Sequence, residues 1–74
     1  MIIDSINTDH IQMIKGLKTV DEYGRTFYKV RAYCLQEVDL KTFRDREPAQ
    51  DYLDKLAEKI TAEDVNHIVI ASEL

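Results

Sequence analysis

An amphipathic helix over residues 46–60 is the strongest structural signal in this sequence. Its apolar residues recur with the i, i+4, i+7, i+8 spacing that places them along one side of a helix. They are Ala49, Leu53, Leu56, Ala57 and Ile60, with Tyr52 beside them. The opposite side is polar and charged, so this helix has to bury one stripe against another element of the fold.

The start of this helix is marked by Asp45, Glu47 and Pro48. A short carboxylate at the N-cap accepts hydrogen bonds from the first free backbone amides, and an acid in the first turn favours the helix dipole. Proline suits the first turn because the amides there have no acceptor within the helix. The sequence therefore predicts that the helix begins after Asp45 and that the Asp45 side chain caps it.

A strand is predicted after the helix. Residues 61–64 resemble a capping box with Asp in place of Glu, and they either add one turn or reverse the chain. The run from Val65 to Ala71 is rich in β-branched residues and has no Asp, Glu, Lys or Arg. Such a run is typical of a strand buried on both faces. Because an exposed edge of this composition invites aggregation, we expect the strand inside the sheet or covered by a partner.

A hairpin is predicted in the first half of the chain. Residues 26–35 alternate between two faces, and the more apolar face, from Tyr28 to Cys34, should meet the helix. A turn over residues 21–24, in which Gly24 supplies positive φ, joins this strand to a preceding strand over residues 11–20. Gly16 interrupts the alternation of that preceding strand and suggests a β-bulge.

Residues 9–16 have a second interpretation, a short helix capped by Thr8 or Asp9 with Ile11 and Ile14 facing inward. Residues 38–43 are either a third strand or the entry into the long helix, and residues 1–6 are a possible short strand. Together these elements predict a single α+β domain over residues 1–74. It has a small, mainly antiparallel sheet with one amphipathic helix packed on one face, in the order β-β-(β)-α-β.

Charge and composition exclude several classes of protein. The net charge of −4 and a pI near 5.0 argue against a strongly basic nucleic-acid binder. Residues 15–46 nevertheless carry a net charge of +3, which leaves room for a local basic surface. A single cysteine excludes an internal disulfide. Without a signal peptide or a run of about 18 apolar residues, we expect a cytoplasmic chain that does not enter a membrane.

The sequence carries no recognisable catalytic or metal-binding motif. Cys34 could pair with His10 or His67 as a nucleophile, but its place on the apolar face favours an inert core cysteine. For His67 a hydrogen-bonded core imidazole is favoured over a metal ligand. The acids on the outer side of the helix, among them Asp51 and Glu58, are typical of a solvated face. We therefore expect no enzyme, no cofactor and no metal.

The most distinctive pattern is a strand face with two aromatic side chains around two bases. Its residues are Phe27, Lys29, Arg31 and Tyr33. Such a face can stack nucleic-acid bases, dock a protein, or simply be solvated with its bases paired to neighbouring acids. The segment does not match the RNP1 pattern of RNA-binding sheets, because Lys29 stands where an aromatic residue is required and Thr26 where glycine is.

These four residues carry the functional hypothesis. One helix cannot cover both faces of a sheet, so the second face should be open to a partner. The first hypothesis is a small non-catalytic protein-binding module, an adaptor or inhibitor, that docks a protein through this face. The alternative is a binder of single-stranded nucleic acid that uses the same residues. We also expect a homodimer, formed through this face or through a strand edge, because so small a domain leaves apolar surface uncovered.

Overall fold

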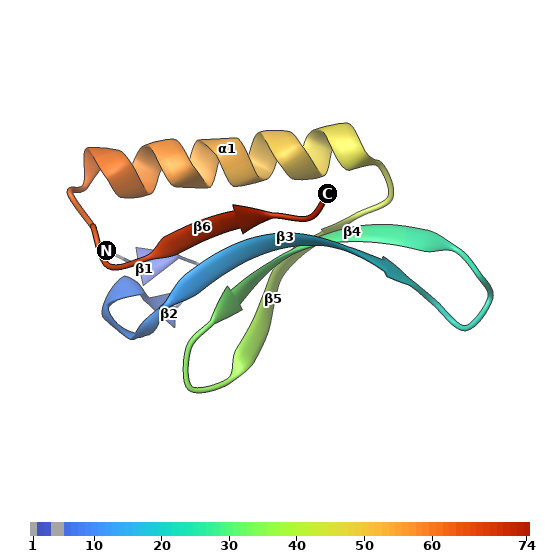
Figure 1. The fold of residues 1–74 in the computed structure, drawn as a ribbon, viewed down its shortest axis with the longest axis horizontal. Helices are drawn as coiled ribbons and strands as arrows, with labels where there is room; N and C mark the ends of the chain where they lie inside the picture. The colour runs from blue at the N-terminus through green and yellow to red at the C-terminus, as the bar shows by residue number, and fades with distance from the viewer. Residues whose placement is uncertain (1, 4–5) are drawn as a thin grey trace.

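The computed structural model describes residues 2–3 and 6–74 of the chain. A four-stranded sheet carries one long helix on one of its faces, in the chain order that the sequence predicts (Figure 1). The strands of this sheet are β3 (Met13–Val20), β4 (Thr26–Tyr33), β5 (Glu37–Phe43) and β6 (Val69–Ser72). Their spatial order is β5-β4-β3-β6. The predicted α+β class, with one helix on one face of the sheet, is confirmed.

The sheet is mixed rather than purely antiparallel. Strands β3, β4 and β5 form an antiparallel meander, whereas β6 pairs in parallel with β3. The helix α1 (Arg46–Ala62) connects β5, at one edge, to β6 at the other. A parallel return needs a long crossover of this kind. No helix within the described residues is long and apolar enough to cross a membrane.

The N-terminal segment forms a small element of its own. Strands β1 (Ile2–Ile3) and β2 (Ile6–Asn7) pair antiparallel, and the short helix η1 (Thr8–His10) follows. The predicted strand over residues 1–6 is thus partly seen, while Met1, Asp4 and Ser5 lie outside the described residues. The alternative helix over 9–16 does not form. Ile11 and Ile14 are nevertheless fully buried, as either interpretation required.

The core lies between α1 and the sheet. Val30 and Ala32 of β4 are fully buried there, on the face of that strand predicted to meet the helix. From α1 the buried residues are Ala49, Leu53, Leu56 and Ile60. The helix ends at Ala62, and Asp64, at φ 61°, reverses the chain. Gly24 has φ 79° in the hairpin turn, as predicted.

The N-terminus of α1 corrects one prediction. Asp45 occupies the N-cap position with extended backbone, at φ −116° and ψ 148°, but its side chain makes no capping hydrogen bond. The predicted start of the helix is confirmed, and the predicted cap is wrong. An acid at this end still interacts favourably with the helix dipole, and Glu47 in the first turn adds to that interaction.

The predicted bulge at Gly16 is also wrong. β3 and β4 pair in unbroken register from Met13 to Val20. Gly16 is required for another reason: a Cβ atom there would lie 2.9 Å from Leu74 Cγ and 3.1 Å from Leu53 Cδ2. The glycine therefore makes room for the C-terminal residues under the helix.

The final strand is shorter and less buried than predicted. β6 covers only Val69–Ser72 and lies at a free edge, where Val69 is 54% and Ile70 36% exposed. Residues 65–68, predicted as its first half, return the chain from the end of α1, and only Ile68 among them is buried. The β-branched composition alone could not distinguish an interior strand from this edge.

Candidate functional site

The candidate site is the face of the sheet opposite α1, which we call the open face. Strand alternation places Phe27, Lys29, Arg31 and Tyr33 together on it, while Val30 and Ala32 point to the helix. The four side chains are half-buried by their neighbours in the sheet. The predicted grouping of these residues is therefore confirmed, and no described helix lies over them (Figure 1).

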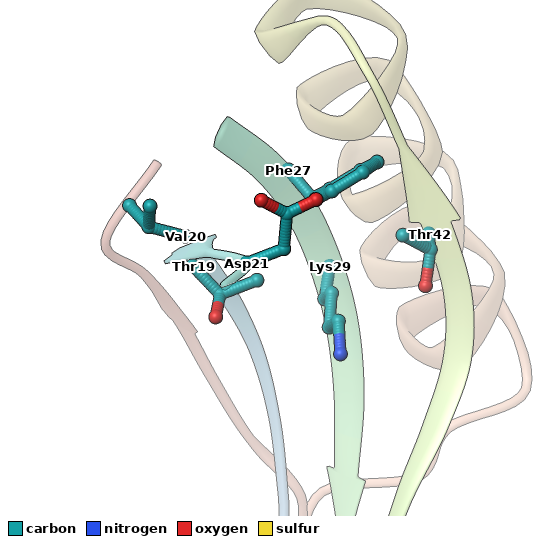
Figure 2. Close-up of a pocket in the computed structure, with 6 residues that line it drawn as sticks. All are labelled: Thr19, Val20, Asp21, Phe27, Lys29 and Thr42. Atoms are coloured by element: carbon teal, nitrogen blue, oxygen red, sulfur yellow. The ribbon is translucent and has the colours of Figure 1, made fainter. Parts of the chain in front are cut away.

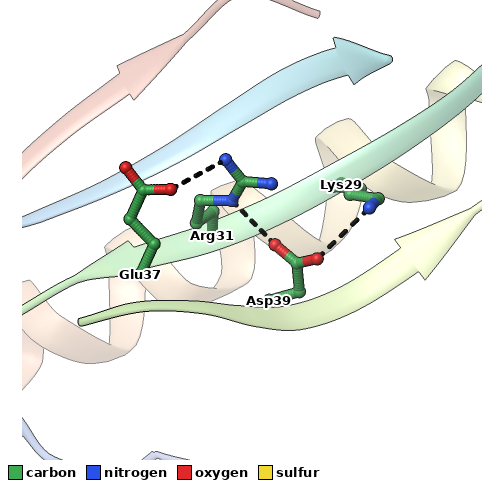
Figure 3. Close-up of polar contacts among 4 residues, drawn as sticks. All are labelled: Lys29, Arg31, Glu37 and Asp39. Carbon is green, nitrogen blue, oxygen red and sulfur yellow. Dashed lines mark hydrogen bonds and ion pairs between the residues drawn. The ribbon is translucent and has the colours of Figure 1, made fainter. Parts of the chain in front are cut away.

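The two bases on β4 are ion-paired with acids on β5 (Figure 3). Arg31 Nε donates to Asp39 Oδ1 at 2.7 Å, and Lys29 Nζ donates to Asp39 Oδ2 at 3.2 Å. Arg31 Nη1 also lies 3.4 Å from Glu37 Oε2. Asp39 thus bridges both bases.

These contacts hold the charges in place. The hydrogen bond from Arg31 lowers the pKa of Asp39 below its ordinary value, with a further contribution from Lys29, although burial acts in the opposite direction. The same hydrogen bond raises the pKa of Arg31. Asp39 therefore remains a carboxylate across the neutral range, and the bases remain partly neutralised by it.

A β-bulge puts Asp39 on the open face. Val30 pairs with Lys41 and Arg31 pairs with Asp39, so Leu40 is an extra residue between them. In a regular ladder Leu40 would stand opposite Arg31. The bulge turns Asp39 toward the bases instead, while Leu40 packs against the core.

A second ion pair lies nearer the β6 edge. Lys15 Nζ of β3 lies 3.0 Å from Glu73 Oε1, just beyond the end of β6. These ion pairs bring three bases and three acids together on the open face, and their charges cancel. They are Lys15, Lys29, Arg31, Glu37, Asp39 and Glu73. Only two of these were singled out from the sequence. The missed residues lie on strands whose pairing the sequence does not show.

Apolar side chains flank this charged centre at both ends. Met13 of β3 lies between Tyr33 of β4 and Val69 of β6 in one row of the sheet. At the other end Phe27 lies opposite Thr19, and Leu17 lies two pairs further in, opposite Lys29. Met13 and Leu17 were not identified from the sequence, although alternation along β3 could have placed them beside the aromatic residues.

A pocket of about 350 Å³ opens around Phe27 and Lys29 (Figure 2). Its other lining residues are Thr19, Val20, Asp21 and Thr42. The two charged groups in it are already engaged. Asp21 Oδ1 accepts from the backbone amides of Tyr23 and Arg25. Lys29 is held by Asp39. The pocket is therefore a hollow in the open face whose charged groups are already paired, rather than a prepared anion site.

The reactive side chains lie away from the open face or at its margin. Cys34 is only half-buried in the turn after β4, where its Sγ donates to the Gln36 carbonyl at 3.0 Å. The prediction of a core cysteine is wrong, because β4 ends at Tyr33. His67 Nε2 donates to the Thr8 carbonyl at 2.9 Å. The predicted hydrogen bond of His67 is confirmed, but its burial in the core is not.

Other predicted alternatives can be placed as well. The acids Asp51, Asp54 and Glu58 are exposed on α1, as a solvated face requires. Within residues 2–3 and 6–74, no three His, Cys, Asp or Glu side chains gather as a metal site would need.

Comparison with protein-family models, with curated proteins and with solved structures gave no match to this chain.

Proposed function

We propose that this chain is a small non-catalytic protein-binding module, an adaptor or inhibitor, that docks its partner through the open face. The observation that carries the proposal is the composition of this face. Aromatic and aliphatic side chains lie at both ends of a centre whose charges cancel. Aromatic residues, methionine and arginine are enriched where proteins bind each other.

The ion pairs favour a protein over nucleic acid. A phosphate would have to compete with Asp39 for Lys29 and Arg31, and it would be repelled by that carboxylate and by Glu37. A protein partner with an uncharged centre can cover the same face and leave the ion pairs intact. Such burial avoids the cost of an unpaired charge.

Single-stranded nucleic acid remains the second candidate, because Phe27 and Tyr33 flank the two bases on one face. Nucleic-acid binding weakens steeply as salt rises, since counterions are released. Loss of Lys29 or Arg31 should then lower the salt slope by about one unit each. The protein-binding module predicts little salt dependence, because the ion-paired charges of the face cancel.

The proposal that the module is non-catalytic rests on how the reactive groups are used. Cys34 Sγ is hydrogen-bonded to the Gln36 carbonyl, and His67 Nε2 to the Thr8 carbonyl. Catalysis by a thiol needs a base within hydrogen-bond reach. Here each group is instead bonded to a backbone carbonyl: Cys34 within the turn after β4, and His67 between the segment before β6 and the short helix η1.

The test compares capture from the native host by the parent chain and by single variants. Phe27→Ala and Tyr33→Ala should each abolish capture of the same protein, because buried aromatic residues carry most interface energy. Tyr23→Ala is the matched control, because Tyr23 is 75% exposed in the hairpin turn, off the open face. The captured protein is then purified and titrated against all four chains.

Two results contradict this function. If Tyr23→Ala weakens binding of the purified partner as much as Phe27→Ala does, the open face is not the docking site. If the parent chain binds a single-stranded oligonucleotide and Lys29→Ala lowers its salt slope, the nucleic-acid alternative replaces the proposal.

A further inference from the structure

The two edges of the sheet are protected to different degrees. β5 carries Glu37, Asp39 and Lys41 and is interrupted by the bulge at Leu40. Charges and bulges are the devices by which natural edges avoid pairing with other strands. β6 has neither, since Val69–Ser72 is uncharged and regular in its pairing with β3. The β6 edge (red in Figure 1) is therefore the one prepared to accept another strand.

The backbone of β6 offers hydrogen-bonding groups on its outer side. The amides of Val69 and Glu73 donate inward, to the carbonyls of Gln12 and Gly16. In a parallel pair alternate residues bond to the same neighbour, so the amides and carbonyls of Ile70 and Ser72 point outward. The sheet ends at β6 among the described residues, and none of them pairs with this outer side.

We propose that β6 pairs antiparallel with β6 of a second copy of this chain, about a two-fold axis perpendicular to the sheet. Two copies of this strand can lie side by side without repulsion, because Val69–Ser72 contains no charged residue. The flanks bring no like charges together either, because antiparallel pairing places His67, before the strand, near Glu73, after the strand, of the other copy.

This pairing joins the two four-stranded sheets into one continuous sheet, with both helices on the same side. It leaves the open face of each copy uncovered, so it goes beyond the proposed function and does not depend on it. The strand pair alone buries less than the roughly 800 Å² per partner of a standard interface. We therefore expect a weak dimer, with a dissociation constant of about 100 µM.

The first test is amide hydrogen exchange of the parent chain at several protein concentrations. The outward amides of Ile70 and Ser72 should exchange freely in dilute solution and become about fivefold slower near 1 mM. The inward amides of Val69 and Glu73 should be protected at every concentration, because they are already bonded to β3. This measurement needs no variant, so it decides the inference even if a variant fails to fold.

The second test is sedimentation equilibrium of matched lysine variants. Ile70→Lys places two ammonium groups close together at the two-fold axis and should raise the dissociation constant at least about tenfold. Val20→Lys is the control, since Val20 is 58% exposed at the far end of β3. It should change the constant by less than about twofold.

Any of four results overturns the inference. The chain stays monomeric near 1 mM, or Val20→Lys weakens the dimer as much as Ile70→Lys, or the Ile70 and Ser72 amides gain no protection. A dimer lost in Phe27→Ala but retained in Ile70→Lys would also overturn it, and would assign the second copy to the open face. Failure of β6 pairing would leave the proposed docking of a partner on the open face untouched.

Discussion

Replacing Gly16 with alanine tests how the C-terminal residues are seated under α1. A Cβ atom at this position would lie 2.9 Å from Leu74 Cγ and Cδ1 and 3.1 Å from Leu53 Cδ2. Carbon atoms in good contact are about 3.5–4.0 Å apart, so Leu74 must move. Leu74 is also held by its carbonyl, which accepts from Arg46 Nε at 2.9 Å, and this contact resists the movement.

Two opposing effects set the size of the change. Overpacking a filled core costs about 1–3 kcal/mol. Glycine inside a strand is about 0.5–1 kcal/mol less stable than alanine, which acts in the other direction. Gly16→Ala should therefore lower the free energy of unfolding by about 0.5–2 kcal/mol. In a Leu74→Ala background the 2.9 Å contacts disappear. The same change should then range from neutral to about 0.5 kcal/mol stabilising.

Urea unfolding of the parent, the two single variants and the double variant measures the coupling between the two positions. We expect a coupling energy of about 1–2 kcal/mol. Leu35→Ala provides a control background, because Leu35 is 96% exposed and remote from Gly16. If Gly16→Ala lowers the free energy of unfolding equally with and without the Leu74 side chain, the glycine does not make room for Leu74, and our account of this position is refuted.

The remaining predictions concern the helix and the ion pairs. Leu53→Ala, at a position 2% exposed, should cost about 2–5 kcal/mol, and a melting temperature within a degree or two of the parent would contradict the packing of α1. Asp45→Ala should lower the free energy of unfolding by less than about 0.5 kcal/mol, because only the dipole interaction is lost. A larger loss, measured by urea unfolding, would show that the Asp45 side chain does cap the helix. The pKa of Asp39 is lowered in the fold, so its contribution to stability is present above its unfolded pKa of about 3.9 and is lost as pH falls through the folded value. Acid unfolding of Asp39→Asn should accordingly depend less on pH below about 4 than that of the parent, and identical curves would contradict the ion pairs.

The helix and the face of β4 were predictable because each depends on local periodicity. The stripe through Leu53 and Leu56 fixes which side of α1 is buried, whatever it packs against. In β4 the alternation that separates Val30 from Arg31 holds over the whole strand, so the sequence predicts both faces.

The position of β6 was not predictable from its own residues. A β-branched, uncharged run is equally compatible with an interior strand and with an edge. The position of β6 in the sheet is decided by the strand order. β4 already pairs with one side of β3, so the strand that returns from α1 pairs with the other side and becomes the edge. That information lies in the pairing of distant segments, which a single sequence does not contain. Cys34 was misplaced for a related reason, because the length of β4 depends on where β5 begins to pair with it.

The bulge at Leu40 links the fold to the proposed function. Regular alternation in β5 would group Val38, Leu40 and Thr42 on one face, and Asp39 with Lys41 on the other. The extra residue changes this phase, so Asp39 shares the open face with Thr42 while Leu40 turns to the core.

Without the bulge, Lys29 and Arg31 would face solvent without this carboxylate between them, and the face would resemble a phosphate-binding sheet. With it, the bases are held by Asp39 at 3.2 and 2.7 Å. In the proposed docking function, the aromatic residues Phe27 and Tyr33 are then the groups left to carry the binding energy. One inserted residue in an edge strand thus turns the charge pattern of β4 from a signal for nucleic acid into support for a protein-docking face.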